Sequence, residues 1–254
     1  MESSGGSIIV TDTDSGNGDD GVDQLTDIET IDFGGATLDI SAATTTATGG
    51  DDLLILTSGS DNVDAGAGAD TVYGGSGGDT IFGGVGDDEI FGDIGDDDID
   101  GGLGDDTLLG GAGNDTLDSG GGGDVIDGGA GADLILIDDG AIDYGLAAID
   151  GGTGTDTVRL EAAAPQAVDK AGLFDSGVLT DIELIDFTGA NVDATMSLTQ
   201  AEIEGVTDGD NDLIININAG DSVDAIGAGP GVISGNTTIY DFGNGTTLEV
   251  VTIT

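Results

Sequence analysis

Ten consecutive blocks of nine residues run from Ala47 to Leu136, and three positions in each block hardly vary. The fourth residue is always Gly, the sixth is always Asp, and the eighth is Val, Ile or Leu. A helical hairpin needs more than nine residues and repeated glycines break helices, so we expect each block to form one turn and one very short strand. Two blocks would then make one coil of a solenoid, and successive coils would stack at a spacing of eighteen residues.

The aliphatic column is expected to form the interior of this solenoid. Successive strand residues point to opposite faces, so the one aliphatic side chain of each strand should point inward while its neighbours face water. The column consists of Leu54, Val63, Val72, Ile81, Ile90, Ile99, Leu108, Leu117, Ile126 and Ile135. One such side chain per nine residues buries too little apolar surface to offset the entropy lost when nine residues are ordered. Apolar burial alone should therefore not hold this segment folded.

The Asp column indicates what holds the coils together. Residues eighteen apart lie on one edge of the solenoid, so the carboxylates should form two files. One file holds Asp52, Asp70, Asp88, Asp106 and Asp124, and the other holds Asp61, Asp79, Asp97, Asp115 and Asp133. Like charges in a file repel one another unless a cation lies between them. Carboxylates and the carbonyls of glycine-rich turns form the all-oxygen ligand set that calcium prefers, and four gaps on each edge predict about eight ions.

This register resembles the nonapeptide repeat of the RTX family of calcium-binding proteins. The resemblance implies an all-β fold, a right-handed parallel β-roll or β-solenoid whose Gly-Gly-x-Gly-x-Asp turns bind Ca²⁺. One further block at 151–159 follows an interruption, and we interpret it as an isolated or capping turn with Asp156 as an additional ligand. The alternative, a disordered acidic linker, is disfavoured because linkers do not keep an aliphatic register.

A second repeated unit flanks the regular blocks. Residues 25–33 and 179–187 are identical at eight of nine positions, and we interpret each copy as a short extended coil with a bend. The resulting organisation has an N-terminal cap or assembly segment at 1–46, the β-roll at 47–136, and a less regular β-rich lobe at 137–254. Similar units recur in large RTX surface proteins and adhesins.

Helices are expected only in the C-terminal lobe. Thr199 and Glu202 have the spacing of a capping box at the start of a short helix, and Gly205 is a candidate stop. A second short helix is predicted over 161–173, with an ordered loop as the alternative.

Composition limits the chemistry that the chain can perform. The chain has 52 acidic residues, two basic residues (Arg159 and Lys170) and a formal net charge of −50, which excludes nucleic acid and anionic membranes as partners. His and Cys are both absent, so nucleophilic triads lack their base and no disulfide or ordinary zinc site is possible. RTX enzymes carry a separate catalytic domain before their repeats. We therefore expect a protein that is not an enzyme.

The ends of the chain bear on its location. The only apolar run near the N-terminus is at residues 8–10 with no basic residue nearby, which does not fit an ordinary secretory signal, and no stretch is long enough to span a bilayer. Export in RTX relatives uses an uncleaved C-terminal type I secretion signal, which residues 248–254 resemble. A β-rich terminus without an export role has the same pattern. Folding that depends on calcium suits a secreted, extracellular or surface-associated protein.

These expectations lead to a functional hypothesis. We expect a non-catalytic, secreted calcium-binding structural protein of an extracellular matrix, surface layer or filament. A solenoid has two open ends, so self-association from head to tail is a candidate role for the flanks, and simple capping is the alternative. The second hypothesis is a C-terminal folding and secretion module of an RTX adhesin or secreted enzyme.

Overall fold

The fold is seen in a computed structural model. The structure describes residues 44–46, 49–56, 58–138, 148–161, 166–167, 173–174, 178–188, 192–193, 195–207, 212–219, 221–243 and 245–253. The predicted N-terminal cap or assembly segment at 1–46 lies almost wholly outside these residues, and so does the first copy of the repeated unit at 25–33.

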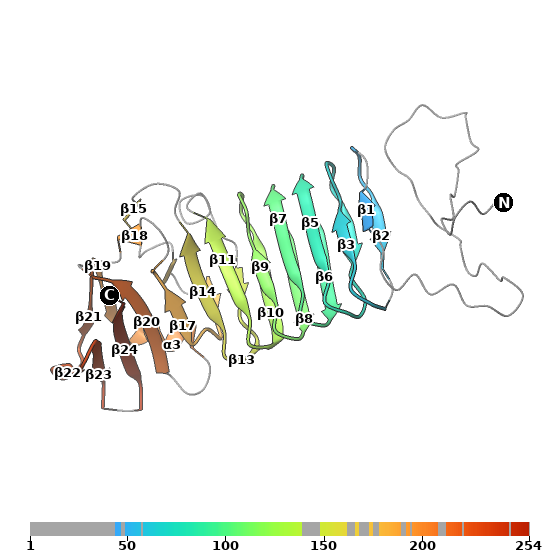
Figure 1. Ribbon diagram of the computed structural model, residues 1–254. Coiled ribbons are helices and arrows are strands. Elements are labelled where there is room, and N and C mark those ends of the chain that lie inside the picture. Colours follow the sequence, from blue (N-terminus) through green and yellow to red (C-terminus); the bar gives the residue numbers. More distant parts are fainter. Residues whose placement is uncertain are drawn as a thin grey trace, which may run out of the picture.

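The described chain coils through two sheets that run along the molecule (Figure 1). The first sheet contains, in spatial order, β1 (Thr44–Thr46), β3 (Asn62–Asp64), β5 (Thr80–Val85), β7 (Asp98–Leu103), β9 (Thr116–Asp118), β11 (Leu134–Asp138), β14 (Thr157–Glu161), β17 (Leu184–Asp186), β20 (Asp212–Asn218), β24 (Thr247–Ile253), β23 (Thr237–Asp241) and β22 (Val232–Ser234). The second contains β16 (Leu179–Thr180), β12 (Ala148–Asp150), β10 (Val125–Gly131), β8 (Thr107–Ala112), β6 (Glu89–Ile94), β4 (Thr71–Tyr73) and β2 (Leu53–Ile55). Five further strands complete the described set: β13 (Thr153–Gly154) pairs with β10, β15 (Gln166–Ala167) with β18 (Val192–Asp193), and β19 (Thr195–Thr199) with β21 (Ser222–Ile226).

Strand pairing follows the repeat. Within the blocks, each strand pairs in parallel with the strand two places along the chain, so Asn62 lies beside Thr80 and Thr80 beside Asp98. Both steps are eighteen residues long, which confirms that two blocks make one coil. The all-β parallel β-roll predicted from the sequence is confirmed.

The aliphatic column forms the core. From Val63 to Ile135 every member is at most 1% exposed, whereas Leu54, in the first block, is partly buried. The same file continues beyond the blocks through Val158, Ile185 and Ile215. One inward side chain per strand is therefore enough to define a continuous interior because the coils stack without a break.

The block at 151–159 is not isolated, which corrects our expectation. Val158 pairs with Ile135 in the first sheet, and Thr153 pairs with Ala130 beside the second sheet. Gly154 also repeats the positive φ of Gly131, at 149° and 153°. Paired residues are 23 apart at this step, compared with eighteen within the regular blocks, because additional residues separate this block from the one before it. The turn at 151–159 nevertheless stacks on the preceding turn in the same register.

The second copy of the repeated unit forms a bent coil, as predicted. Its two strands, β16 and β17, belong to different sheets, and the bend between them includes Asp181 at a φ of 52°. Asp181 is one of two non-glycine residues with positive φ in the described part of the chain. The parallel stack then continues through β20 and β24 before β23 and β22 add to it in antiparallel fashion.

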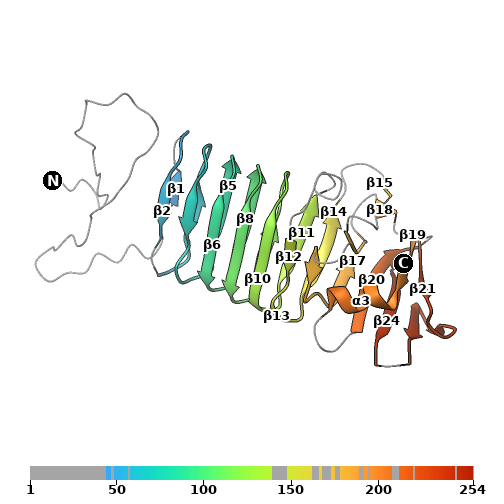
Figure 2. The ribbon, with the colours of Figure 1, turned by 180° about the vertical axis from the view of Figure 1, so that it is seen from behind.

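Helix α3 (Gln200–Val206) lies beside β16 at the end of the second sheet, where the Ile182 N–H donates to the Val206 carbonyl (Figure 2). The capping box predicted from Thr199 and Glu202 is confirmed. The predicted stop is wrong because Gly205 lies within the helix. The helix ends at Val206, after which Thr207 directs both its N–H and its hydroxyl to the Ile203 carbonyl.

The helix predicted over 161–173 is wrong at Glu161 and at Gln166–Ala167, which lie in strands, whereas Leu173 at its end is helical. Glu161 ends β14, and Gln166–Ala167 form β15. Leu173 and Phe174 are helical and pack in the core. The parallel pairing of β15 with β18 overrides the local preference for a helix. No helix in the described residues is long and apolar enough to cross a bilayer.

Candidate metal centre

Two ladders of aspartates follow the turns of the β-roll. In each ladder the Oδ1 atom accepts a hydrogen bond of 2.7–2.9 Å from the backbone N–H of the Asp eighteen residues earlier. One ladder joins Asp52, Asp70, Asp88, Asp106 and Asp124, and the other joins Asp61, Asp79, Asp97, Asp115 and Asp133. The structure therefore assembles both predicted files. It also adds a contact that the sequence did not indicate, namely direct hydrogen bonding along each file.

The second carboxylate oxygen, Oδ2, takes no part in these hydrogen bonds. All the ladder side chains are buried, with exposed fractions of 8% or less. Within the described structure the Oδ2 atom has no hydrogen-bond partner at Asp70, Asp79, Asp88, Asp97, Asp106, Asp115, Asp124, Asp133 and Asp156. A buried, unpaired carboxylate oxygen is costly, so a whole row of them points to a missing counter-ion.

Backbone carbonyls face the same space. A Cβ atom added to Gly92 would lie 2.5 Å from Oδ2 of Asp97 and 2.6 Å from the Gly110 carbonyl oxygen. A Cβ atom at Gly83 would meet the equivalent pair, Oδ2 of Asp88 and a carbonyl of the next coil. Glycine at the first position of a block thus leaves open a space lined by oxygen atoms.

These oxygens fit a hard divalent cation. Calcium takes six to eight oxygen ligands and accepts both carboxylates and carbonyls. Within the described residues no point brings together three or more acidic side chains, so an ion held here would depend on carbonyls for most of its ligands. The turns that begin with glycine supply such carbonyls beside the Oδ2 atoms of both ladders, at Asp79, Asp88, Asp97, Asp106, Asp115 and Asp133.

Burial dominates the electrostatics of the ladders. It raises the pKa of Asp97 and Asp106 to about 7 and that of Asp70 and Asp115 to about 6. The backbone N–H bond opposes this shift, and the neighbouring carboxylates of the file add to it. Several ladder aspartates would therefore carry protons near neutral pH if no cation were bound.

We expect the metal-free β-roll to gain stability as the pH falls from 7.5 to 5. A carboxyl whose pKa is raised in the fold binds more protons folded than unfolded between about pH 4, its unfolded pKa, and about pH 7. Its destabilising contribution is therefore largest at neutral pH and fades on acidification. Far-ultraviolet circular dichroism in buffer stripped of calcium would measure this.

The opposite trend is expected with calcium present, because protons compete with the cation for the same carboxylates. The calcium concentration needed for half-maximal folding should rise as the pH falls over this range. A metal-free β-signal that weakens steadily between pH 7.5 and 5 would contradict the assignment of raised pKa values to the ladders.

One ladder extends beyond the regular blocks. The Asp133 N–H donates to Oδ1 of Asp156 at 2.8 Å, so Asp156 continues this ladder and does not stand in an isolated turn. The Asp156 N–H in turn donates to Oε2 of Glu183 at 2.7 Å. Glu183 was missed in the sequence because it belongs to the repeated unit at 179–187 and not to a nine-residue block. Its presence in both copies of that unit is the only available signal.

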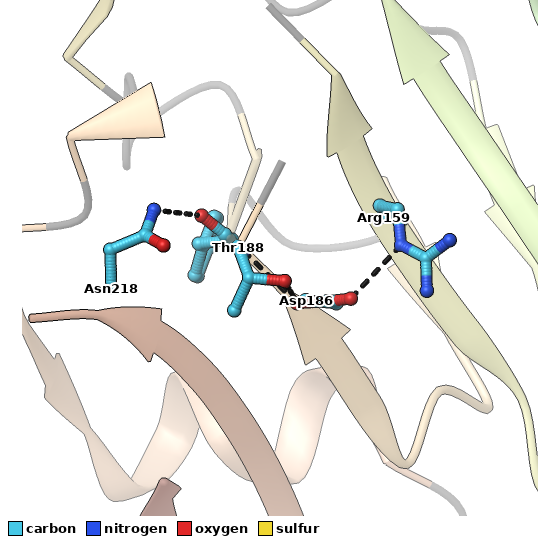
Figure 3. A network of polar contacts seen from close by, with 5 residues as sticks. Arg159, Asp186, Thr188 and Asn218 are labelled. Carbon is cyan, nitrogen blue, oxygen red and sulfur yellow. Dashed lines mark hydrogen bonds and ion pairs between the residues drawn. The ribbon is translucent and has the colours of Figure 1, made fainter. Parts of the chain in front are cut away.

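A separate polar network joins the strands after the ladder. The Arg159 side chain pairs with Asp186 at 2.9 Å, and Thr188 donates to the same carboxylate through its N–H and hydroxyl (Figure 3). Asn218 donates to the Phe187 carbonyl at 3.2 Å. Burial alone would raise the pKa of Asp186, but the Thr188 and Arg159 contacts hold it below its usual value. This network ties β14 to β17 and β20 without a metal.

Comparison with known families agrees with this geometry. Residues 46–81, 73–108 and 100–135 each match the RTX calcium-binding nonapeptide repeat (4 copies). The matched region coincides with the regular part of both ladders. No curated protein matches the chain.

Proposed function

We propose that this chain, which carries RTX calcium-binding nonapeptide repeats over residues 46–135, is a secreted, non-catalytic structural protein whose β-roll folds when calcium binds. The observation that carries the proposal is the row of buried Oδ2 atoms facing glycine carbonyls along both ladders. A cation between successive turns would satisfy both sets of oxygens and remove the repulsion within each file.

The proposed ligands are the ladder aspartates. They are Asp52, Asp61, Asp70, Asp79, Asp88, Asp97, Asp106, Asp115, Asp124, Asp133 and Asp156. With one ion in each gap between successive turns, the regular β-roll would hold about eight. The β-roll at 47–136 then acts as one folding unit, between the segment at 1–46 and the lobe at 137–254.

The proposed location follows from mass action. RTX repeat proteins are typically secreted, and binding that exists only in the folded state stabilises the fold in proportion to the calcium available. The ten regular blocks at 47–136 contain no basic residue, because Arg159 ends the later block at 151–159 and Lys170 follows it, so no side-chain cation within these ten blocks replaces the metal. The β-roll would therefore remain unfolded at low calcium concentrations and fold at millimolar calcium concentrations.

The proposed structural role includes self-association of the protein end to end. The first sheet ends on the edge strand β22, where Val232 and Ile233 are 68% and 75% exposed. Helix α3 lies at the corresponding end of the second sheet. A second copy could thus dock on β22 through the first sheet alone, in a head-to-tail contact that need not close.

Electron microscopy of the calcium-loaded protein tests this role. We expect rods joined end to end, and we expect Ile233→Asp to yield separate rods. Thr238→Asp, on the neighbouring strand β23, is a control that also adds one charge. Separate rods for the unaltered chain would contradict self-association and favour the second candidate, a C-terminal folding and secretion module of an RTX adhesin or enzyme.

A further inference from the structure

Ser119 interrupts the run of glycines that begins at the first position of the block at Gly74. The three blocks before that run begin with Ala47, Leu56 and Ala65. Gly83 and Gly101 precede ladder aspartates by five residues, and their Cα atoms border the oxygen-lined space. The next residue in this file is Ser119, five residues before Asp124. A side chain therefore occupies a place that the neighbouring coils keep open.

The serine hydroxyl is buried and unsatisfied. Ser119 is 0% exposed, and its Oγ atom has no hydrogen-bond partner in the described structure. The same holds for Asp124, which is 0% exposed and whose Oδ2 atom lacks a partner. A hydroxyl buried without a partner costs free energy, whereas alanine or glycine at this site would avoid the cost.

The backbone around Ser119 makes room for its side chain. Gly120, the next residue, has a φ of 66°, whereas the equivalent Gly102 and Gly111 have 95° and 107°. A Cβ atom at Gly101 would lie 3.2 Å from the Ser119 carbonyl oxygen, compared with 2.5 Å for the equivalent contact one coil earlier. The Ser119 carbonyl oxygen is therefore farther from the preceding coil than the equivalent Gly101 carbonyl oxygen is.

Strand pairing changes at the same point. Strand β9 ends at Asp118, as β4 ends at Tyr73 and β12 at Asp150, whereas β7 and β8 continue through their first and second glycines. The Asp118 side chain instead accepts a hydrogen bond of 3.1 Å from the Gly120 N–H. The Asp150 side chain accepts the same hydrogen bond from the Gly152 N–H in a block that begins with Gly151, so this contact does not depend on the serine.

We propose that the Ser119 hydroxyl is an additional calcium ligand, which gives the turn that contains Asp124 a site unlike those of the neighbouring coils. This inference rests on the proposed calcium binding. In the coils of Gly83 and Gly101, a Cβ atom would lie 2.6 Å from Oδ2 of the aspartate five residues on. The register places the Ser119 side chain on the same side, towards Oδ2 of Asp124.

The chemistry of a hydroxyl suits this role. A neutral oxygen adds one ligand without adding charge to a file that already repels itself. Calcium tolerates coordination numbers up to eight and irregular geometry, whereas magnesium demands near-ideal octahedral geometry. The added ligand should therefore strengthen calcium binding at this turn, and magnesium should gain little from it.

The test titrates the full chain with calcium and counts bound ions by equilibrium dialysis. Ser119→Ala and Ser119→Gly both remove the hydroxyl, and the glycine variant restores the residue found in the neighbouring coils. We expect each variant to weaken one site by about tenfold, the order of loss expected when a metal-orienting group is removed. At a calcium concentration of about three times the Kd of the unaltered site, each variant should bind about half an ion fewer.

Ser58→Ala provides the matched control, because Ser58 is an exposed serine in another turn and its variant should bind calcium as the unaltered chain does. Calcium isotherms of Ser119→Ala and Ser119→Gly that coincide with that of the unaltered chain would overturn the inference and leave the proposed function intact. An unaltered chain that binds no calcium would overturn the proposed function itself.

Discussion

Chelating calcium at neutral pH should abolish the β-signal of the roll in far-ultraviolet circular dichroism, and adding calcium back should restore it. The physical reason is that the metal-free ladders bury carboxylates whose Oδ2 atoms lack partners, while one inward aliphatic side chain per strand supplies little compensating burial. Each site that holds calcium at 100 times its Kd adds about 2.7 kcal/mol to the stability of the folded state. Several sites together exceed the whole stability of a typical domain, so the expected effect is large.

A matched pair of variants separates site binding from net charge. Asp97 is a buried member of a ladder, and its neighbour Asp98 is exposed on β7. Asp97→Asn and Asp98→Asn remove the same charge, but only the first removes a proposed ligand. We expect Asp97→Asn to raise the calcium concentration for half-maximal folding about tenfold, and Asp98→Asn to lower it slightly or leave it unchanged. Equal shifts in the two variants would indicate general charge screening.

Gly122→Ala should destabilise the calcium-loaded protein by at least roughly 3 kcal/mol, as measured by chemical denaturation. Gly122 has a φ of 150°, a conformation that side chains rarely adopt, and a Cβ atom there would collide with the Gly104 carbonyl of the preceding coil. The clash is with backbone atoms of the preceding coil, so no rotamer change relieves it. The turn would have to separate from its neighbour, which would also widen the oxygen-lined spaces.

The adjacent glycine provides the control for that substitution. A Cβ atom at Gly121 would lie 3.5 Å from Cδ2 of Leu103, which is ordinary van der Waals contact. Gly121→Ala should therefore change stability by less than about 1 kcal/mol. If Gly121→Ala and Gly122→Ala lowered stability by similar amounts, the loss would not come from the close backbone approach at Gly122. It would instead mean that these turns tolerate no added side chain at either position.

Much of the β-roll follows from periodicity alone. The step of eighteen residues, the buried aliphatic column and the two files of aspartates all depend on which residues recur, and recurrence is visible in the sequence. The hydrogen bond from each Asp N–H to the next Oδ1 was not foreseen. It depends on the direction of the backbone within the turn, which the positive φ of glycines such as Gly104 and Gly113 determines.

Prediction was weaker where the repeat ends. The capping box at Thr199 is a local signal and was found, whereas α3 ends at Val206, whose carbonyl accepts a hydrogen bond from the distant Ile182 N–H, a tertiary contact that no local signal encodes. The block at 151–159 appeared isolated because the interruption hides its register in the sequence. Glu183 was missed for a related reason, since it extends a ladder by tertiary stacking and not by period.

Crystals grown with calcium and measured for anomalous scattering test the central claim most directly. The account predicts anomalous peaks between successive turns along both edges of the β-roll, each beside an Oδ2 atom of a ladder aspartate and within ligand distance of glycine carbonyls. An ordered β-roll with calcium in the crystal solution and no peaks between its turns would contradict it.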